Sequence, residues 1–228
     1  MRRHRMLPLP LLSFVAAASF VTVLLAPGEG FAVGGHDGHG GHSTSFKTAQ
    51  QAAFHDQMRQ LWEEHVVWTR LAIISFAADL PDLSATEQRL LQNQTDIGNA
   101  IAPFYGKQAG QQLTQLLKSH ILIAVDVLGD AKSGNTTKLS QDEAIWYDNA
   151  NQIADFLSAA NPRNWPDQVM REQMREHLDE TLKESVDRLQ GDYPADIADF
   201  QQVEEHILHM SDLLSNGIIK QFPQRFNK

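Results

Sequence analysis

Histidine is the residue type in this chain that could do the most chemistry. The 228 residues include 10 histidines and no cysteine, which excludes disulfides, thiolate metal sites and cysteine nucleophiles. The neutral imidazole nitrogen of histidine is a ligand that suits Zn, Cu, Ni and Fe. Four histidines lie within apolar patterns of helical spacing and are the candidate metal ligands: His65, His120, His177 and His206.

The first three of these histidines share a local pattern. Apolar residues stand seven and three places before each of them and one place after, as with Met58 and Trp62 before His65. His206 shares part of this pattern, whereas His55 is out of phase with it and is predicted to be exposed. Positions i−7, i−3 and i+1 lie on the same side of a helix as position i, so four imidazoles should face the core and converge there.

A buried imidazole must form hydrogen bonds or bind a metal, because lost solvation otherwise costs on the order of a few kcal/mol. The Glu-x-x-His pairs of di-iron bundles are absent, and histidine ligands disfavour Mg and Ca. A Zn or Cu site with the four histidines as ligands therefore fits best, and a b-type haem held by two of them is a weaker alternative. Six further residues could orient the imidazoles by hydrogen bonds: Asp96, Asn99, Asp126, Asp148, Asn151 and Asp212.

Three classes of function stay open at this point. The leading hypothesis is a metal-binding protein without catalytic activity. The second is a structural or interaction domain in which the buried histidines, aspartates and asparagines satisfy one another without metal. The third is a metal-dependent hydrolase or oxidase that uses an open coordination position. The chain has no nucleophile elbow, no HExxH motif and no phosphate-binding glycine loop, so we lean against an enzyme.

Helices are expected to position these histidines. Apolar residues recur at helical spacing from Thr48 onward, and no segment shows the two-residue alternation of a strand. Two helices are predicted to begin at capping boxes, at Ser84 and at Ser140. The sequence predicts an all-α bundle of about six helices, paired as three hairpins with internal repeat character. Proline, glycine and turn-rich segments place the helices at about 48–79, 84–105, 108–129, 140–161, 166–190 and 195–221.

Two segments precede the helical bundle domain, which spans 47–228. Residues 1–32 have a basic start, an apolar run and small residues at the end, which is typical of a cleaved signal peptide rather than an uncleaved anchor. We therefore expect a secreted or periplasmic protein with no stable membrane anchor. Residues 33–46 are glycine-rich and predict a flexible tail, in which three histidines could collect metal ions: His36, His39 and His42.

The charge of the chain bears on its partners. The formal net charge is −9, and no basic stripe interleaved with aromatic residues is present. An acidic surface repels the phosphate backbone of nucleic acid, so we expect no nucleic-acid partner. The predicted partner is a metal ion, and the sequence specifies no protein partner.

Several motifs together resemble a family of uncharacterised bacterial helical proteins, many of which are exported. The likeness covers about residues 54–226. It implies an exported, all-helical fold, and it implies no activity or site residues because the family has no established activity. The motifs are LWEEHVVWTR (61–70), NQTDIGNAIAPFYG (93–106), LLKSHI (116–121), NPRNWP (161–166) and HILHMSDLL (206–214).

Overall fold

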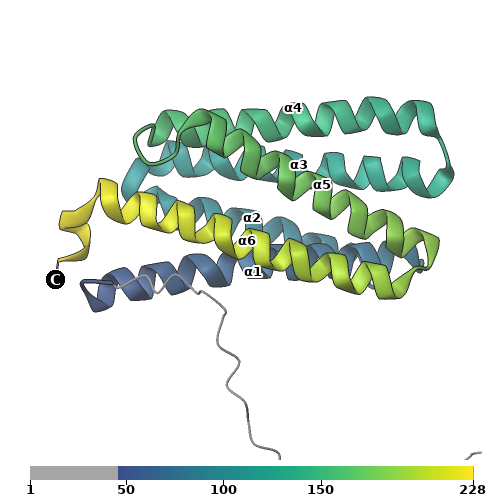
Figure 1. Ribbon diagram of the computed structural model, residues 1–228, viewed down its shortest axis with the longest axis horizontal. Helices are drawn as coiled ribbons and strands as arrows, with labels where there is room; N and C mark the ends of the chain where they lie inside the picture. The colour runs from purple at the N-terminus through teal and green to yellow at the C-terminus, as the bar shows by residue number, and fades with distance from the viewer. Residues whose placement is uncertain (1–45, 228) are drawn as a thin grey trace, which may run out of the picture. The chain divides into compact units, whose positions relative to one another are not determined.

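The computed structural model describes residues 46–227, which fold into six α-helices and a short 3-10 helix (Figure 1). No strand occurs among these residues, so the predicted all-α class is confirmed. None of the described helices is long and apolar enough to cross a lipid bilayer. The expected signal peptide and the tail histidines His36, His39 and His42 lie outside the described residues. The elements are α1 (Ala49–Ala77), α2 (Leu83–Tyr105), α3 (Lys107–Ser133), α4 (Thr136–Ala160), α5 (Asp167–Gln190), α6 (Tyr193–Gln221) and η1 (Pro223–Phe226).

The six helices close into a ring. Each helix packs against the next one along the chain, and α6 packs back against α1. The fifth helix, α5, runs obliquely from the end of α4 to the start of α6 and also contacts α1 and α3 (Figure 1). Side chains from all six helices form one apolar core, in which Met58, Ile97, Leu113, Ile153 and Ile207 are almost fully buried. Residues on α5 are therefore placed to meet residues from several other helices.

The turn between α3 and α4 shows where sequence signals for helix ends were misread. Gly134 ends α3 in the left-handed conformation, with φ of 71°. Asn135 starts α4 at once, because its side chain accepts a hydrogen bond from the backbone N–H of Lys138. The predicted start at Ser140 was wrong because this earlier cap already satisfies the first turn. The predicted start of the second helix was correct to within one residue, but Ser84 is not its cap, because α2 begins at Leu83 after Asp82.

The two ends of the described chain are tied to each other. The hydroxyl of Thr48, which caps α1, donates a hydrogen bond to the backbone oxygen of Phe226 at 2.8 Å. The Phe226 ring is buried and contacts the rings of Phe54 and Phe104. The residues before α1 and after α6 thus belong to one hydrophobic cluster.

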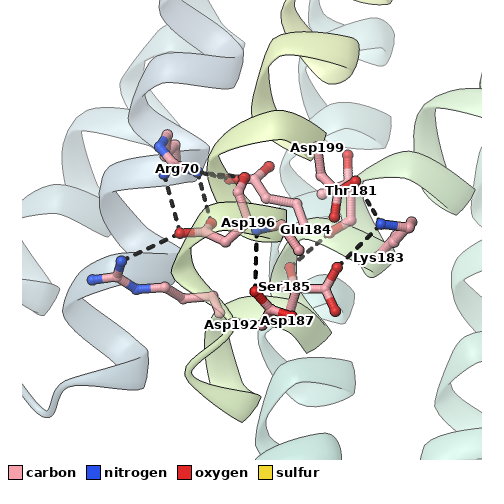
Figure 2. A network of polar contacts seen from close by, with 11 residues as sticks. Arg70, Thr181, Lys183, Glu184, Ser185, Asp187, Asp192, Asp196 and Asp199 are labelled. Carbon is pink, nitrogen blue, oxygen red and sulfur yellow. Dashed lines mark hydrogen bonds and ion pairs between the residues drawn. The ribbon is translucent and has the colours of Figure 1, made fainter.

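A buried ion network joins α1 to α5 and α6 near the α5–α6 turn (Figure 2). The Nη1 atom of Arg70 lies 2.7 Å from Glu184 Oε1 and 2.8 Å from Asp196 Oδ1. The side chains of Glu184 and Asp196 are 1% and 0% exposed, so water cannot solvate their charge. Arg188 adds a second guanidinium at 3.3 Å from Asp196. Two carboxylates are therefore balanced by two guanidinium groups in the interior.

The contact between Trp165 and Gly217 leaves no room for a larger side chain on α6. Trp165 is 1% exposed, and a Cβ atom added to Gly217 would lie 2.1 Å from its Nε1 atom. We expect Gly217→Ala to lower the free energy of unfolding by about 1–3 kcal/mol through overpacking, measured by urea denaturation. Gly129→Ala on α3 is the matched control, because no atom lies within 4 Å of its added Cβ. A control variant as unstable as Gly217→Ala would contradict this interpretation.

Candidate metal centre

The four histidines predicted as ligands form one cluster, in which the ring of His177 contacts the other three. They come from α1, α3, α5 and α6, and their exposed fractions are 3% for His65, 3% for His120, 4% for His177 and 9% for His206. The ring centroid of His177 lies 5.7 Å from that of His65, 6.2 Å from that of His120 and 6.4 Å from that of His206. All four residues are thus buried and their rings lie near one another, but among the described residues the only group of three ligand atoms within 4.8 Å contains just one of them, His206. Their role as metal ligands stays a prediction.

Three of these histidines meet a polar residue that lies 29 positions later in the chain. His65 Nδ1 is 3.2 Å from Gln94 Nε2, and His120 Nδ1 is 2.9 Å from Asn149 Oδ1, with a separation of 29 residues in both pairs. The ring of His177 faces that of His206 at the same sequence separation, with ring planes 9° apart. Sequence reasoning missed Gln94 and Asn149, and this equal separation is the signal that could have found them.

The six residues predicted to orient the imidazoles lie elsewhere. None of the hydrogen bonds among the described residues joins one of these six residues to the four clustered histidines. Asp212 instead binds His55, with Oδ1 2.8 Å from Nε2, so the prediction that His55 is exposed was wrong. Asp96 lies two positions after Gln94. Two positions correspond to a rotation of about 200° around the helix axis, so the Asp96 side chain points away from the clustered histidines. The remaining four are exposed or half-buried: Asn99, Asp126, Asp148 and Asn151.

Burial keeps the inner imidazoles neutral. It lowers the pKa of His65 to about 3, with a smaller contribution from the nearby His120. It lowers the pKa of His120 to about 4, against the opposing hydrogen bond to Asn149. The pKa of His177 is also well below its ordinary value, first because of burial and then because of its histidine neighbours. At neutral pH these three rings are therefore uncharged hydrogen-bonding groups.

His206 belongs to a group of three possible metal ligands at the edge of the histidine cluster. Glu176 and Glu180 on α5 and His206 on α6 each offer a ligand atom, and these atoms all lie within 4.8 Å of one another. The two glutamates share a helix face because they are four positions apart. They line an open cleft of about 410 Å³. Sequence reasoning missed both glutamates, since such pairs are common on solvated helices.

The hydrogen bond from His206 to the Gln173 backbone leaves the Nδ1 atom of the ring facing these glutamates. Its Nε2 atom is 3.0 Å from the backbone oxygen of Gln173, and a carbonyl oxygen can only accept, so Nε2 carries the hydrogen. The Nδ1 atom of the neutral ring then presents a lone pair, 3.5 Å from Glu176 Oε2. Burial, with Glu176 and Asp179 nearby, raises the pKa of Glu180 to about 7. Its Oε2 atom is buried without a hydrogen-bond partner among the described residues.

No family model, curated protein or solved structure matches the chain. The resemblance to a family of exported helical proteins therefore stays a prediction. The chemistry of the site follows from its own geometry. Two carboxylates and an imidazole lone pair face one another, so a proton or a metal cation between them would relieve their repulsion.

Proposed function

We propose that the protein binds one divalent transition-metal ion, Zn(II) or Cu(II), at Glu176, Glu180 and His206. The main support is the proximity of their ligand atoms, all within 4.8 Å of one another. A cation would compensate the facing lone pairs of His206 and Glu176 and the unpartnered oxygen of Glu180. The backbone oxygen of Gln173 would hold the imidazole in the orientation that binding needs.

The ligand types narrow the choice of metal. Carboxylate oxygen and imidazole nitrogen suit Zn(II) and Cu(II), whereas Cu(I) prefers sulfur ligands. Of the four histidines predicted as ligands, this proposal retains His206 and replaces the other three with two glutamates. The ion would therefore sit at the wall of the bundle, where water can still reach the remaining coordination positions.

The proposed role is metal binding without catalysis, outside the cytoplasm. Support for this compartment comes from the signal-peptide pattern of residues 1–32. Support for metal capture comes also from the glycine-rich segment, whose histidines would bring ions to the chain: His36, His39 and His42. The competing function is a structural or interaction domain in which the buried polar groups satisfy one another without metal.

Calorimetric titration with Zn(II) tests the site in the full-length chain without a histidine tag. The three tail histidines are replaced by glutamine in every protein, so that only the bundle can bind. We expect one equivalent of Zn(II), and a rise in the free energy of unfolding of about 2.7 kcal/mol when free Zn(II) is 100 times Kd. His206→Gln and Glu180→Gln should each weaken binding at least about tenfold, because each removes a ligand.

His209→Gln is the matched control, because His209 is exposed and lines the same cleft outside the ligand group. This variant should bind Zn(II) as the parent does. A chain with its natural tail is titrated alongside, and Zn(II) binding by that chain alone would place the metal in the tail. Binding that survives both His206→Gln and Glu180→Gln would also overturn the proposed site and would place the metal elsewhere in the bundle. Absence of binding in every protein would favour the structural domain.

A further inference from the structure

Gln94 fixes the position of the proton on His65. The amide nitrogen of Gln94 donates to the backbone oxygen of Leu90 at 2.9 Å and to Asn93 Oδ1 at 3.1 Å. The reversed amide would set its oxygen against two other oxygens, so the atom 3.2 Å from His65 Nδ1 is the nitrogen. This nitrogen has two hydrogens and no accepting lone pair, so Nδ1 of His65 can only accept, sharing one hydrogen with the oxygen acceptors. The hydrogen of the neutral ring is therefore on Nε2.

Asn149 fixes the opposite arrangement on His120. The amide nitrogen of Asn149 donates to the backbone oxygen of Leu116 at 3.3 Å, so its Oδ1 atom faces the imidazole. This oxygen lies 2.9 Å from His120 Nδ1 and can only accept a hydrogen bond. His120 therefore carries its hydrogen on Nδ1 and has a lone pair on Nε2. The two inner rings present one donor and one acceptor to their surroundings.

His177 contacts both rings, and each of the three imidazoles has a nitrogen without a protein partner among the described residues. Within the described part of the chain, the hydrogen bonds of His65 and His120 leave Nε2 of each ring without a protein partner. The Nδ1 atom of His177 is also buried without a partner there. The buried Nδ1 atom of His177, left unsatisfied, costs on the order of 1–3 kcal/mol. A molecule that bonds to several of these nitrogens would remove that cost.

We propose that His65, His120 and His177 form a second site, which binds one neutral molecule of the size of water that both donates and accepts hydrogen bonds. It would accept from Nε2–H of His65 and donate to Nε2 of His120, with His177 as a further contact. Buried waters commonly make two to four such bonds. The site is separate from the proposed metal site and would exist whether or not that site binds metal.

A metal ion suits this inner site less well. The Nε2 atom of His65 carries a hydrogen where a ligand needs a lone pair, and freeing it would break the bond to Gln94. The burial that lowers the pKa of His65 and His120 also disfavours any other positive charge beside them. Opposite proton positions suit an amphiprotic molecule, since it meets one donor and one acceptor.

Nitrogen-15 NMR of the full-length chain tests the proposal directly, with water as the probe. Long-range proton–nitrogen correlations should show the hydrogen on Nε2 of His65 and on Nδ1 of His120 at pH 7. The ring protons should also show cross-relaxation with a water molecule that exchanges slowly. The same proton position on both rings, or no slowly exchanging water beside them, would refute the site.

Addition of one equivalent of Zn(II) separates a neutral ligand from a metal. The nitrogen shifts of His65 and His120 should stay unchanged, and a large shift of both would show an inner metal site instead. Asn149→Leu removes the acceptor for Nδ1, so we expect His120 to move its hydrogen to Nε2 and the slow water to be lost. Asn151→Leu, two positions along the same helix, should retain both signals. If Asn149→Leu does not fold, the proton positions in the parent protein still decide the question.

Discussion

Replacement of Arg70 by methionine is expected to lower the free energy of unfolding by about 3–5 kcal/mol, which is the usual cost of breaking a buried ion pair. Methionine retains much of the volume of the arginine stem but removes the charge that faces Glu184 and Asp196. Both carboxylates are almost fully buried, so water does not replace the lost partner. Urea denaturation at pH 7, followed by circular dichroism, measures the change.

Arg89→Met is the matched control for this prediction. Arg89 contacts Glu64 at 2.7 Å, but both side chains are about one-third exposed. An ion pair so open to solvent contributes about 0–1 kcal/mol, so this variant should be close to the parent protein. Burial raises the pKa of Glu184 to about 7, and its protonation should reduce the cost of Arg70→Met at pH 5. Equal costs for the two arginines would show that burial does not set the strength of the network.

Acidification is the second change with a large expected effect. The folded state holds the pKa of His65 at about 3 and that of His120 at about 4, whereas the ordinary value is 6.5. Below pH 6.5 the unfolded chain therefore binds protons that the folded chain does not bind. Stability contributed by these rings is complete above pH 6.5 and is lost as the pH falls toward 4 and 3. For the two rings together the loss by pH 4 is at most roughly 6 kcal/mol.

Glu184 opposes this loss in the upper part of the range. Its pKa is raised to about 7, first by burial, so the folded chain binds a proton there before the unfolded chain does. This uptake stabilises the fold as the pH falls from 7 to about 4.5, the ordinary value for glutamate. Below that value both states are protonated at Glu184 and the offset stops growing. Below about pH 4 the folded rings begin to take up protons as well, so we expect the steepest loss of stability between about pH 5 and pH 4.

Urea denaturation of the parent protein and His120→Gln at several pH values between 7 and 3.5 measures this effect. Glutamine does not titrate, so the variant should be less stable than the parent at pH 7 but lose less stability on acidification. His209→Gln replaces an exposed histidine and should retain the pH dependence of the parent. A His120→Gln variant with the parent's pH dependence would show that His120 is not the source of acid sensitivity.

Helical periodicity was enough to predict the fold class and the burial of the four histidines, although His55 was wrongly predicted to be exposed. Apolar residues at fixed offsets from His65, His120 and His177 placed all three rings in the interior, where they are found. This succeeds because burial of a helix face depends mainly on its own sequence. The leader and tail predictions for residues 1–46 rest on composition alone.

Partners across helices were harder to predict, because they depend on how far one helix is shifted along another. Aspartates near Gln94 and Asn149 looked equally suitable as partners, yet a shift of two positions moves a side chain to another face. Glu176 and Glu180 lie beside His206 only because of the relative position of α5 and α6 along their axes. Local sequence patterns do not determine the relative axial position of two packed helices. The repeated separation of 29 residues between paired side chains does indicate it.

The bond between Thr48 and Phe226 has a consequence for chain connectivity. Since the first and last helical segments already touch, a short peptide could join them, and the backbone could be opened instead at the exposed turn after Gly134. Such a circular permutant would begin with α4 and end with α3 while every helix retained its neighbours. Its folding rate, compared with that of the natural order, would separate the role of loop closure from that of side-chain packing.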